Sequence, residues 1–250
     1  MNQDSRILIL MSDNRDLSSN LNESDYNSLA TYINYKYSEK FGYDFKYLQP
    51  RIDGENTIFN CFSPTNKIRH ASWSKLLSVK KILKEHPEYD WILYIDSDCI
   101  FKDDSRSLFK YLSDAKTLDN KNLNFDRDLI FMNNQPYNVD KPCAGFFIIR
   151  NTNTALNFLD YWYSDEEEDW CNTIHPWEQT PLQYRLKFEF EMINDWMFFE
   201  KPSQFLRHIG TAEDFNRIPY FRSMIKDSED FARTMNEISK QIIRYNTKYS

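Results

Sequence analysis

Glycine is scarce in this 250-residue chain, with only four copies: Gly42, Gly54, Gly145 and Gly210. These positions cannot form a Gly-x-Gly-x-x-Gly loop or a Walker loop, the glycine-rich backbones that hold phosphate in many nucleotide-binding proteins. If the protein handles phosphate, a metal ion or basic side chains must therefore contact it.

Long apolar runs are also absent. The first apolar stretch, at positions 6–11, is too short for the core of a signal peptide, and no run approaches the length of a membrane span. We therefore expect no transmembrane segment and a cytoplasmic location, an expectation that leaves peripheral membrane association open. The four cysteines lack the paired spacing of a zinc cluster, which predicts free thiols in a reducing compartment.

Basic residues are outnumbered, since 31 Lys and Arg face 38 Asp and Glu and the net charge is −7. A nucleic-acid binder normally carries a basic surface, so we expect no nucleic-acid partner. Hydrophobic residues make up 41% of the chain, which is typical of a globular protein. Because no repeat or linker divides the sequence, we predict a single domain over residues 1–250.

The most informative stretch, at positions 90–101, is an apolar run that ends in two carboxylates (Asp-Trp-Ile-Leu-Tyr-Ile-Asp-Ser-Asp-Cys-Ile-Phe). Residues 91–95 lack the polar alternation of a half-exposed strand, which predicts a strand buried on both faces. Asp96 and Asp98 are spaced i, i+2, so both can point the same way past the end of the strand, where open α/β sheets bind ligands. Their oxygens suit Mg²⁺ or Mn²⁺. By itself, however, Asp-x-Asp in an acidic protein is more often a solvated turn.

Apolar periodicity predicts alternating strands and helices around this stretch. Ser24 is the expected cap of the first helix, and Gly42 fits the left-handed position that ends it. The order strand, helix, strand, helix, strand is typical of a parallel sheet with crossover helices. The predicted strands are 7–11, 45–48, 91–95, 129–132, 146–149, 192–199 and 205–209, and the predicted helices are 24–41, 72–85, 108–112, 152–163 and 176–188.

Two further segments each allow a structural and a functional interpretation. The acidic run at 165–169 favours a solvated loop over a second cation site, because adjacent carboxylates repel one another. The tail at 229–245 has apolar residues at helical spacing, which favours a helix packed on the domain over a membrane-surface or partner helix. We expect residues from about 213 to 250 to form a C-terminal helical extension.

Four ordered segments resemble a known family, the family 34 galactosyl, mannosyl and xylosyl transferases. The first runs from Trp73-Ser-Lys75 through His86-Pro87 to the Asp-Ser-Asp block at 96–98. The others are Ala144-Gly-Phe-Phe-Ile-Ile-Arg-Asn at 144–151, Glu-Gln-Thr-Pro-Leu at 178–182 and His-Ile-Gly at 208–210. The chain departs from the family after this last motif, where Thr-Ala-Glu-Asp at 211–214 replaces basic and glycine-rich residues.

The resemblance implies the GT-A fold, a Rossmann-like mixed α/β sheet flanked by helices. It also implies a metal-dependent, retaining transferase with a nucleotide-sugar donor and a glycan or glycoprotein acceptor. The donor is expected to be a UDP-sugar, with a GDP-sugar as the alternative. In this family pattern Asp98 is a direct metal ligand, Asp96 shares the metal or touches the ribose, and His208 is the third ligand. An imidazole ligand favours Mn²⁺ over Mg²⁺, whereas a lone histidine is otherwise more often a satisfied core residue.

The same comparison suggests roles on the sugar side. Gln179 matches a glutamine that the family has near the anomeric carbon, and Glu178 is then expected to bind sugar or acceptor hydroxyls. The alternative for this pair is the first turn of a helix, where an acid complements the helix dipole. Gly145 is expected to let the sugar approach the backbone at the start of a strand.

Three residues are candidates for the nucleotide. Lys75 lies near the phosphates in this interpretation, although a solvated helix lysine is an equal alternative. Ser12 and Asp13 follow the first strand and are assigned to the base or ribose by fold analogy alone. Two other functions remain open at this point: a carbohydrate-binding or scaffold module without activity, and a sugar-1-phosphate nucleotidyltransferase. For the latter, the loop at 12–16 supplies only one basic residue, Arg15.

Overall fold

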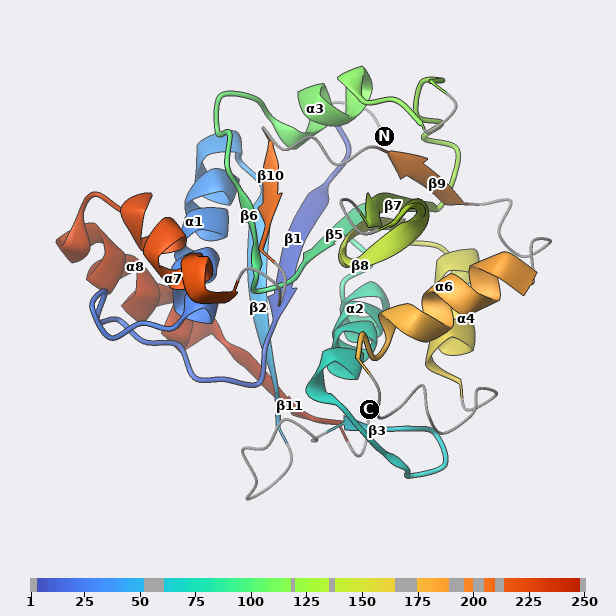
Figure 1. The fold of residues 1–250 in the computed structure, drawn as a ribbon, viewed down its shortest axis with the longest axis horizontal. Helices are drawn as coiled ribbons and strands as arrows, with labels where there is room; N and C mark the ends of the chain where they lie inside the picture. Colours follow the sequence, from blue (N-terminus) through green and yellow to red (C-terminus); the bar gives the residue numbers. More distant parts are fainter. Residues whose placement is uncertain are drawn as a thin grey trace.

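The computed structural model of the protein describes residues 4–51, 61–117, 120–134, 138–164, 175–188, 196–199, 205–209 and 214–247. At its centre is a seven-stranded mixed sheet with the strand order β11-β2-β1-β5-β8-β7-β9 (Figure 1). These strands are β1 (Ile7–Ser12), β2 (Asp44–Arg51), β5 (Trp91–Ile95), β7 (Leu129–Asn134), β8 (Asn138–Arg150), β9 (Trp196–Phe199) and β11 (Ile243–Asn246).

Helices cover both faces of this sheet. One side carries α1 (Tyr26–Phe41), α7 (Asp214–Ser223) and α8 (Ser228–Gln241), and the other carries α2 (Ser74–Glu85), α4 (Asn153–Tyr163) and α6 (Gln179–Phe188) (Figure 1). Along β1, Ile9 packs in the core that includes Leu29 of α1, whereas Leu10 packs in the core that includes Leu76 of α2. Because successive strand residues face opposite cores, central strands are apolar throughout. The predicted burial of β5 on both faces is confirmed.

The strand directions divide the sheet into two parts. β1 pairs in parallel with β2 and β5, and β11 pairs in parallel with β2, whereas β8 runs antiparallel to both β5 and β7. The parallel strands β2, β1 and β5 form the predicted crossover arrangement. The antiparallel strand β8 makes the sheet mixed. The remaining elements are α3 (Leu108–Asp114), the 3-10 helix η1 (Ala71–Trp73) and two small sheets, β3 (Cys61–Phe62) with β4 (Ile68–Arg69) and β6 (Cys99–Phe101) with β10 (Leu206–His208).

Several predicted boundaries are corrected by the structure. The cap of α1 is Asp25, whose side chain accepts from Tyr26 N, while Ser24 instead donates to Asn20 O at 2.6 Å. Gly42 does end this helix in the left-handed region, with φ of 71°. α6 starts at Gln179 rather than at position 176.

The C-terminal segment is not helical throughout. α8 ends at Gln241, and β11 follows it as an edge strand, with Tyr245 opposite Pro50. β2 continues through Pro50 to Arg51 and pairs there with β11. The sequence predicted instead that this strand ends before the proline. α7 lies within the expected helical extension, although no separate helix was predicted over its residues. The expected helical extension is therefore two helices packed near α1 and a strand of the main sheet.

Some sequence predictions lie outside the described residues. These are the acidic run at 165–169, the glycines at 54 and 210, the cysteine at 171 and the first part of the 192–199 strand. Within the described part of the chain, no helix is both long and apolar enough to cross a membrane.

Candidate active site

The turn after β5 presents the two carboxylates that the sequence singled out. Asp96 N donates to Gly145 O of β8 at 2.9 Å, and Cys99 N donates to Asp96 O at 3.0 Å. These backbone bonds fix the turn against the neighbouring strand. Asp96 and Asp98 therefore leave a rigid, buried strand at its carboxyl end, as predicted.

The small β6–β10 sheet brings a distant histidine to this turn. His208 is paired with Cys99 in the antiparallel register, and Ile209 N donates to Asp98 O at 2.9 Å. Because Cys99 directly follows Asp98, the strand pairing sets the His208 side chain beside that carboxylate. Nε2 of His208 lies 3.3 Å from Oδ1 of Asp98.

Asp98 and His208 also shift each other's pKa. Burial alone would raise the pKa of Asp98, but His208 and then Arg217 lower it to about 2. Burial alone would lower the pKa of His208, but Asp98 raises it to about 10. Oδ1 of Asp98 is buried and makes no hydrogen bond to any described residue. This oxygen is compensated by the His208 ring 3.3 Å away, and its remaining lone pairs are those that a cation would use.

Asp96 has a different partner, the ammonium group of Lys75. Lys75 Nζ lies 2.7 Å from Asp96 Oδ2 and 2.7 Å from Glu178 Oε1, and the lysine side chain is only 3% exposed. Burial raises the pKa of Asp96 to about 6 against the opposing effect of Lys75. Burial would lower the pKa of Lys75, but Asp96 and Glu178 raise it above its ordinary value. The solvated-lysine alternative for Lys75 is therefore wrong, since this residue joins the Asp96 and Glu178 carboxylates.

Gly145 lies where the two halves of the site meet. A Cβ atom at this position would come within 3.2 Å of Asp96 Oδ2, 3.5 Å of His208 Cε1 and 3.5 Å of Cys143 Sγ. Asp96 and His208 thus flank one small residue, and a side chain there would contact His208 and crowd the Asp96 carboxylate. The Cys143 thiol also lies 3.7 Å from His208 Nδ1, the ring nitrogen opposite the one that faces Asp98.

The segment before α6 brings Glu178 and Gln179 to the same strand. Gln179 Oε1 accepts from Ala144 N at 2.9 Å, and Lys75 Nζ donates to Ala144 O at 3.3 Å. Trp162 Nε1 donates to Glu178 O at 2.8 Å, which anchors the backbone ahead of the helix. Glu178 Oε2 is buried and makes no hydrogen bond to any described residue. The structure therefore groups Lys75, Glu178 and Gln179 around the peptide that precedes Gly145.

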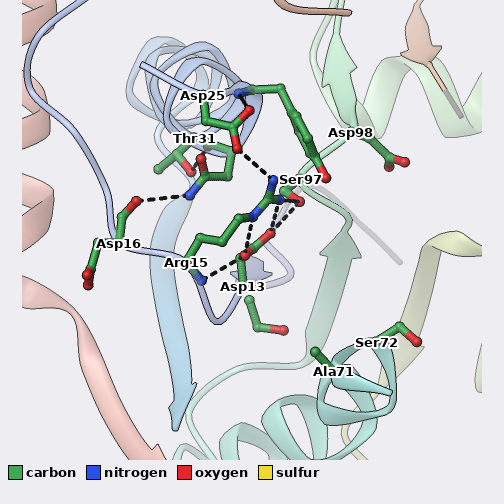
Figure 2. A network of polar contacts seen from close by, with 12 residues as sticks. Asp13, Arg15, Asp16, Asp25, Thr31, Ala71, Ser72, Ser97 and Asp98 are labelled. Atoms are coloured by element: carbon green, nitrogen blue, oxygen red, sulfur yellow. Dashed lines mark hydrogen bonds and ion pairs between the residues drawn. The ribbon is translucent and has the colours of Figure 1, made fainter. Parts of the chain in front are cut away.

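The loop after β1 forms a polar cluster next to the Asp96–Asp98 turn. Arg15 contacts Asp13 at 2.5 Å, Ser97 at 3.0 Å and Asp25 at 3.1 Å, and Ser97 Oγ donates to Asp13 Oδ2 at 2.6 Å. Figure 2 shows Arg15 at the centre of these contacts, with Asp98 beside them. Asp13 is thereby tied to the residue between the two carboxylates.

Ser12 lies further in, with Oγ 3.2 Å from the Tyr94 hydroxyl. Tyr94 belongs to β5, so this contact joins the ends of β1 and β5. Both Ser12 and Tyr94 are buried.

Three residues near the carboxylates were not predicted as site residues: Arg15, Cys143 and Arg217. Arg217 Nη2 lies 3.9 Å from Asp98 Oδ2, and the side chain is 4% exposed. Arg15 was noted only as the single basic residue of its loop. Cys143 is two residues before Gly145 and carried no motif signal, and Arg217 lies in the expected C-terminal helical extension, where no residue was assigned to the site.

The ligand atoms offered by Asp98, His208 and Asp96 meet the requirements of a divalent cation only in part. Cis ligands of an octahedral cation, each about 2.1 Å from the metal, lie about 3 Å apart, close to the Asp98 Oδ1–His208 Nε2 separation. The unbonded Asp98 Oδ1 and the room left by Gly145 agree with a cation here. Among the described residues, however, no three His, Cys, Asp or Glu side chains are gathered as a ligand group. Asp96 is held by Lys75 instead.

Several known proteins are similar in sequence to part of this chain. Galactomannan galactosyltransferase 1 of Cyamopsis tetragonoloba is 30% identical over 120 residues, which are 46% of this chain and 25% of the relative. An uncharacterized alpha-1,2-galactosyltransferase of Schizosaccharomyces pombe is 24% identical over 186 residues, which are 64% of this chain and 45% of the relative. The chain thus spans less than half the length of either relative.

A solved structure extends the likeness to the whole fold. It is a glycosyltransferase involved in the glycosylation of the major capsid of PBCV-1, with a TM-score of 0.61, 14% identity, and coverage of 88% of this chain and all of that one. Together with the mixed sheet and its helices, this confirms the predicted GT-A fold. The family model for the galactosyl transferase GMA12/MNN10 family matches residues 3–236. This match covers most of the chain and agrees with the family that the four sequence segments resemble, so the chain belongs to the galactosyl transferase GMA12/MNN10 family.

Proposed function

We propose that the protein is a metal-dependent, retaining glycosyltransferase that moves a sugar from a nucleotide diphosphate sugar to a glycan hydroxyl. The observation that carries this proposal is the buried Asp98 Oδ1 that faces His208 Nε2 at 3.3 Å beside Asp96. The family membership supports sugar transfer as the reaction, in preference to a nucleotidyl transfer or a scaffold role.

Asp98 and His208 would hold Mn²⁺, or Mg²⁺, with one ligand atom each. Asp96 has one carboxylate oxygen on Lys75, so its role is either a contact through the other oxygen or a hydrogen bond to the ribose. When bound, the cation would supply Lewis-acid stabilisation of the negative charge on the leaving diphosphate.

The residues around Ala144 would contact the sugar. Gln179 turns its side-chain oxygen to Ala144 N, which orients its amide group and supports a position beside the anomeric carbon. Glu178 has one oxygen on Lys75 and the other without a hydrogen bond among the described residues, so a sugar or acceptor hydroxyl would satisfy it. Gly145 would let the sugar approach the end of β5 closely.

Near β1, Asp13 and Ser12 remain the candidates for the base and ribose. Asp13 faces Arg15 and Ser97, and Ser12 is buried against Tyr94. Both side chains thus already have protein partners, and the nucleotide would contact them beside Arg15 and Tyr94.

A donor panel tests this proposal. UDP-galactose and UDP-xylose come first, since relatives of the chain are named galactosyl- and xylosyltransferases, followed by other UDP- and GDP-sugars. Mn²⁺-dependent hydrolysis or transfer by the wild type is expected, with a loss of at least about 100-fold in Asp98→Asn. The matched control is Asp114→Asn, because Asp114 is an exposed carboxylate paired with Lys110 on α3. Equal turnover in Asp98→Asn and the wild type would contradict the proposed metal role.

The stereochemistry of the product tests the retaining assignment separately. NMR of the product is expected to give the same anomeric configuration as the donor. An inverted product would remove Gln179 from its assigned place and require a carboxylate base near the acceptor. Glycan binding without any metal-dependent nucleotide binding, measured by calorimetry, would favour a binding module instead.

A further inference from the structure

The ring of His208 has a polar partner at each of its two nitrogens. Nε2 lies 3.3 Å from Asp98 Oδ1, and Nδ1 lies 3.7 Å from Cys143 Sγ. Because sulfur is larger than oxygen, 3.7 Å is a hydrogen-bond distance for this second pair, although sulfur is a weak acceptor. The imidazole is therefore held between a carboxylate and a thiol.

The course of β8 brings Cys143 to the histidine. The pairing of β8 with β5 ends at Phe146, opposite Ile95, whereas β8 begins well before this residue and extends past the carboxyl end of β5. Its register against β7 also shifts beyond Phe131. Such irregular pairing turns side chains in new directions and is common next to active sites. Cys143 lies in this extended part of the strand, beside the turn that carries the two carboxylates.

Gly145 leaves the space that the thiol and the imidazole need to meet. A Cβ atom at Gly145 would be 3.5 Å from both Cys143 Sγ and His208 Cε1. The thiol and the ring therefore lie on the same side of β8, and Gly145 places no side chain against them. Cys143 is only 1% exposed, so solvent has little access to its sulfur as a competing partner.

The position of the imidazole proton matters at a site that binds a cation. A histidine binds a metal through a nitrogen that carries no proton. If Nε2 of His208 is to share a cation with Asp98, the ring must keep its proton on Nδ1. The hydrogen bond at the second nitrogen decides which of the two carries the proton. Cys143 offers an acceptor at Nδ1, on the side of the ring that does not face Asp98.

We infer that Cys143 is a positioning residue for the cation, because its sulfur accepts the Nδ1 proton of His208 and keeps the Nε2 lone pair directed at Asp98. This inference rests on the proposed function, since it needs a cation shared by Asp98 and His208. Partners behind a metal-binding histidine are usually carboxylates, backbone carbonyls or waters, and they fix both the proton and the orientation of the ring. In this chain a sulfur takes that place.

The test measures Mn²⁺ binding to the full chain without nucleotide, by electron paramagnetic resonance, in two variants that differ by one acceptor atom. Cys143→Ala is expected to weaken Mn²⁺ binding about tenfold, as for other losses of a partner behind a metal-binding histidine. Cys143→Ser leaves nearly the same space but keeps an acceptor. Its hydroxyl reaches less far than the thiol, so partial recovery is expected, with Mn²⁺ bound at least about threefold more tightly than by the alanine variant.

Cys61→Ala is the control for the loss of a buried thiol. Cys61 Sγ lies 3.2 Å from the Tyr163 hydroxyl and does not contact Asp98 or His208. This variant is expected to bind Mn²⁺ like the wild type. Urea unfolding of each variant checks that the comparison is made on folded protein.

Two results would overturn the inference while leaving the proposed function intact. The first is a Mn²⁺ affinity of Cys143→Ala within about twofold of the wild type. The second is the same loss in the alanine and serine variants, which would mean that Cys143 acts through packing alone. A wild type that binds no Mn²⁺ would overturn the proposed metal role as well. If Cys143→Ala does not unfold cooperatively, Cys143→Val, which fills the space without an acceptor, replaces it under the same criteria.

Discussion

The ammonium group of Lys75 and the carboxylate of Glu178 form a buried ion pair with a separation of 2.7 Å. The same ammonium group pairs with Asp96 at 2.7 Å, so one lysine compensates two carboxylates from different parts of the chain. Removing one partner of a buried pair leaves an uncompensated charge, which costs more than the pair itself contributes.

Lys75→Met is therefore expected to lower the free energy of unfolding by about 3–5 kcal/mol, because Asp96 and Glu178 both lose their partner. Urea unfolding measures this change. The control is Lys81→Met on the same helix, where the exposed i, i+4 pair with Glu85 is worth about 0.5 kcal/mol or less. Equal, small effects for both variants would contradict the structural role assigned to Lys75.

Gly145→Ala is expected to disturb the site more than the fold. The added methyl group would lie 3.2 Å from Asp96 Oδ2, so this carboxylate must shift by a few tenths of an ångström, whereas the 3.5 Å to His208 Cε1 is an ordinary contact. Mn²⁺ affinity, measured by electron paramagnetic resonance, is expected to fall about tenfold, as for other changes that misorient metal ligands.

Gly42→Ala is the matched control for this substitution. Its backbone has a φ of +71° and nothing lies within 4 Å of an added Cβ, so only backbone strain of about 1 kcal/mol is expected. A Gly145→Ala protein that loses stability but keeps its Mn²⁺ affinity would show that Gly145 matters for packing alone.

Gln179→Glu separates the structural from the catalytic role of this side chain. The glutamate retains an oxygen that can accept from Ala144 N, which Gln179 now does at 2.9 Å, but it loses the amide N–H groups. We expect UDP affinity within about threefold of the wild type and a transfer rate at least about tenfold lower. Unchanged transfer by the glutamate variant would remove Gln179 from the sugar face.

Tyr245→Phe tests whether β11 is integral to the fold. The Tyr245 hydroxyl donates to Ser74 O at 3.0 Å and lies 2.8 Å from Ser78 Oγ, so it joins the edge strand to α2. The loss of these bonds is expected to cost about 1–2 kcal/mol of unfolding free energy, measured in urea. No measurable change would mean that β11 is attached mainly through its backbone.

Much of the central fold follows from local patterns that a sequence displays directly. The apolar run of β5 and the Asp96-Ser-Asp98 turn are contiguous, so periodicity alone predicts a buried strand with carboxylates at its end. The N-cap of α1 was misplaced by one residue because Ser24 and Asp25 are both good capping residues. β11 was missed because the apolar spacing of α8 continues to Ile242, which hides the point where the helix ends.

Residues whose environment depends on distant segments were harder to predict. Lys75 has the sequence context of any helix lysine, and its burial depends on Glu178, which lies in the segment before α6. Arg217 lies in α7, within the expected C-terminal helical extension, but its contact with Asp98 depends on how that helix packs and was not expected. His208 was expected from the family resemblance, whereas the β6–β10 pairing that positions it is a tertiary feature.

The most direct measurement is Mn²⁺ binding in the absence of any nucleotide, followed by electron paramagnetic resonance. The account predicts binding by the wild type and by Asp114→Asn, and a loss of at least about tenfold in both Asp98→Asn and His208→Gln, since the first removes the negative charge of a ligand and the second replaces the imidazole nitrogen with a neutral amide. Mn²⁺ binding of wild-type strength in both variants would contradict the claim that Asp98 and His208, 3.3 Å apart, share a divalent cation.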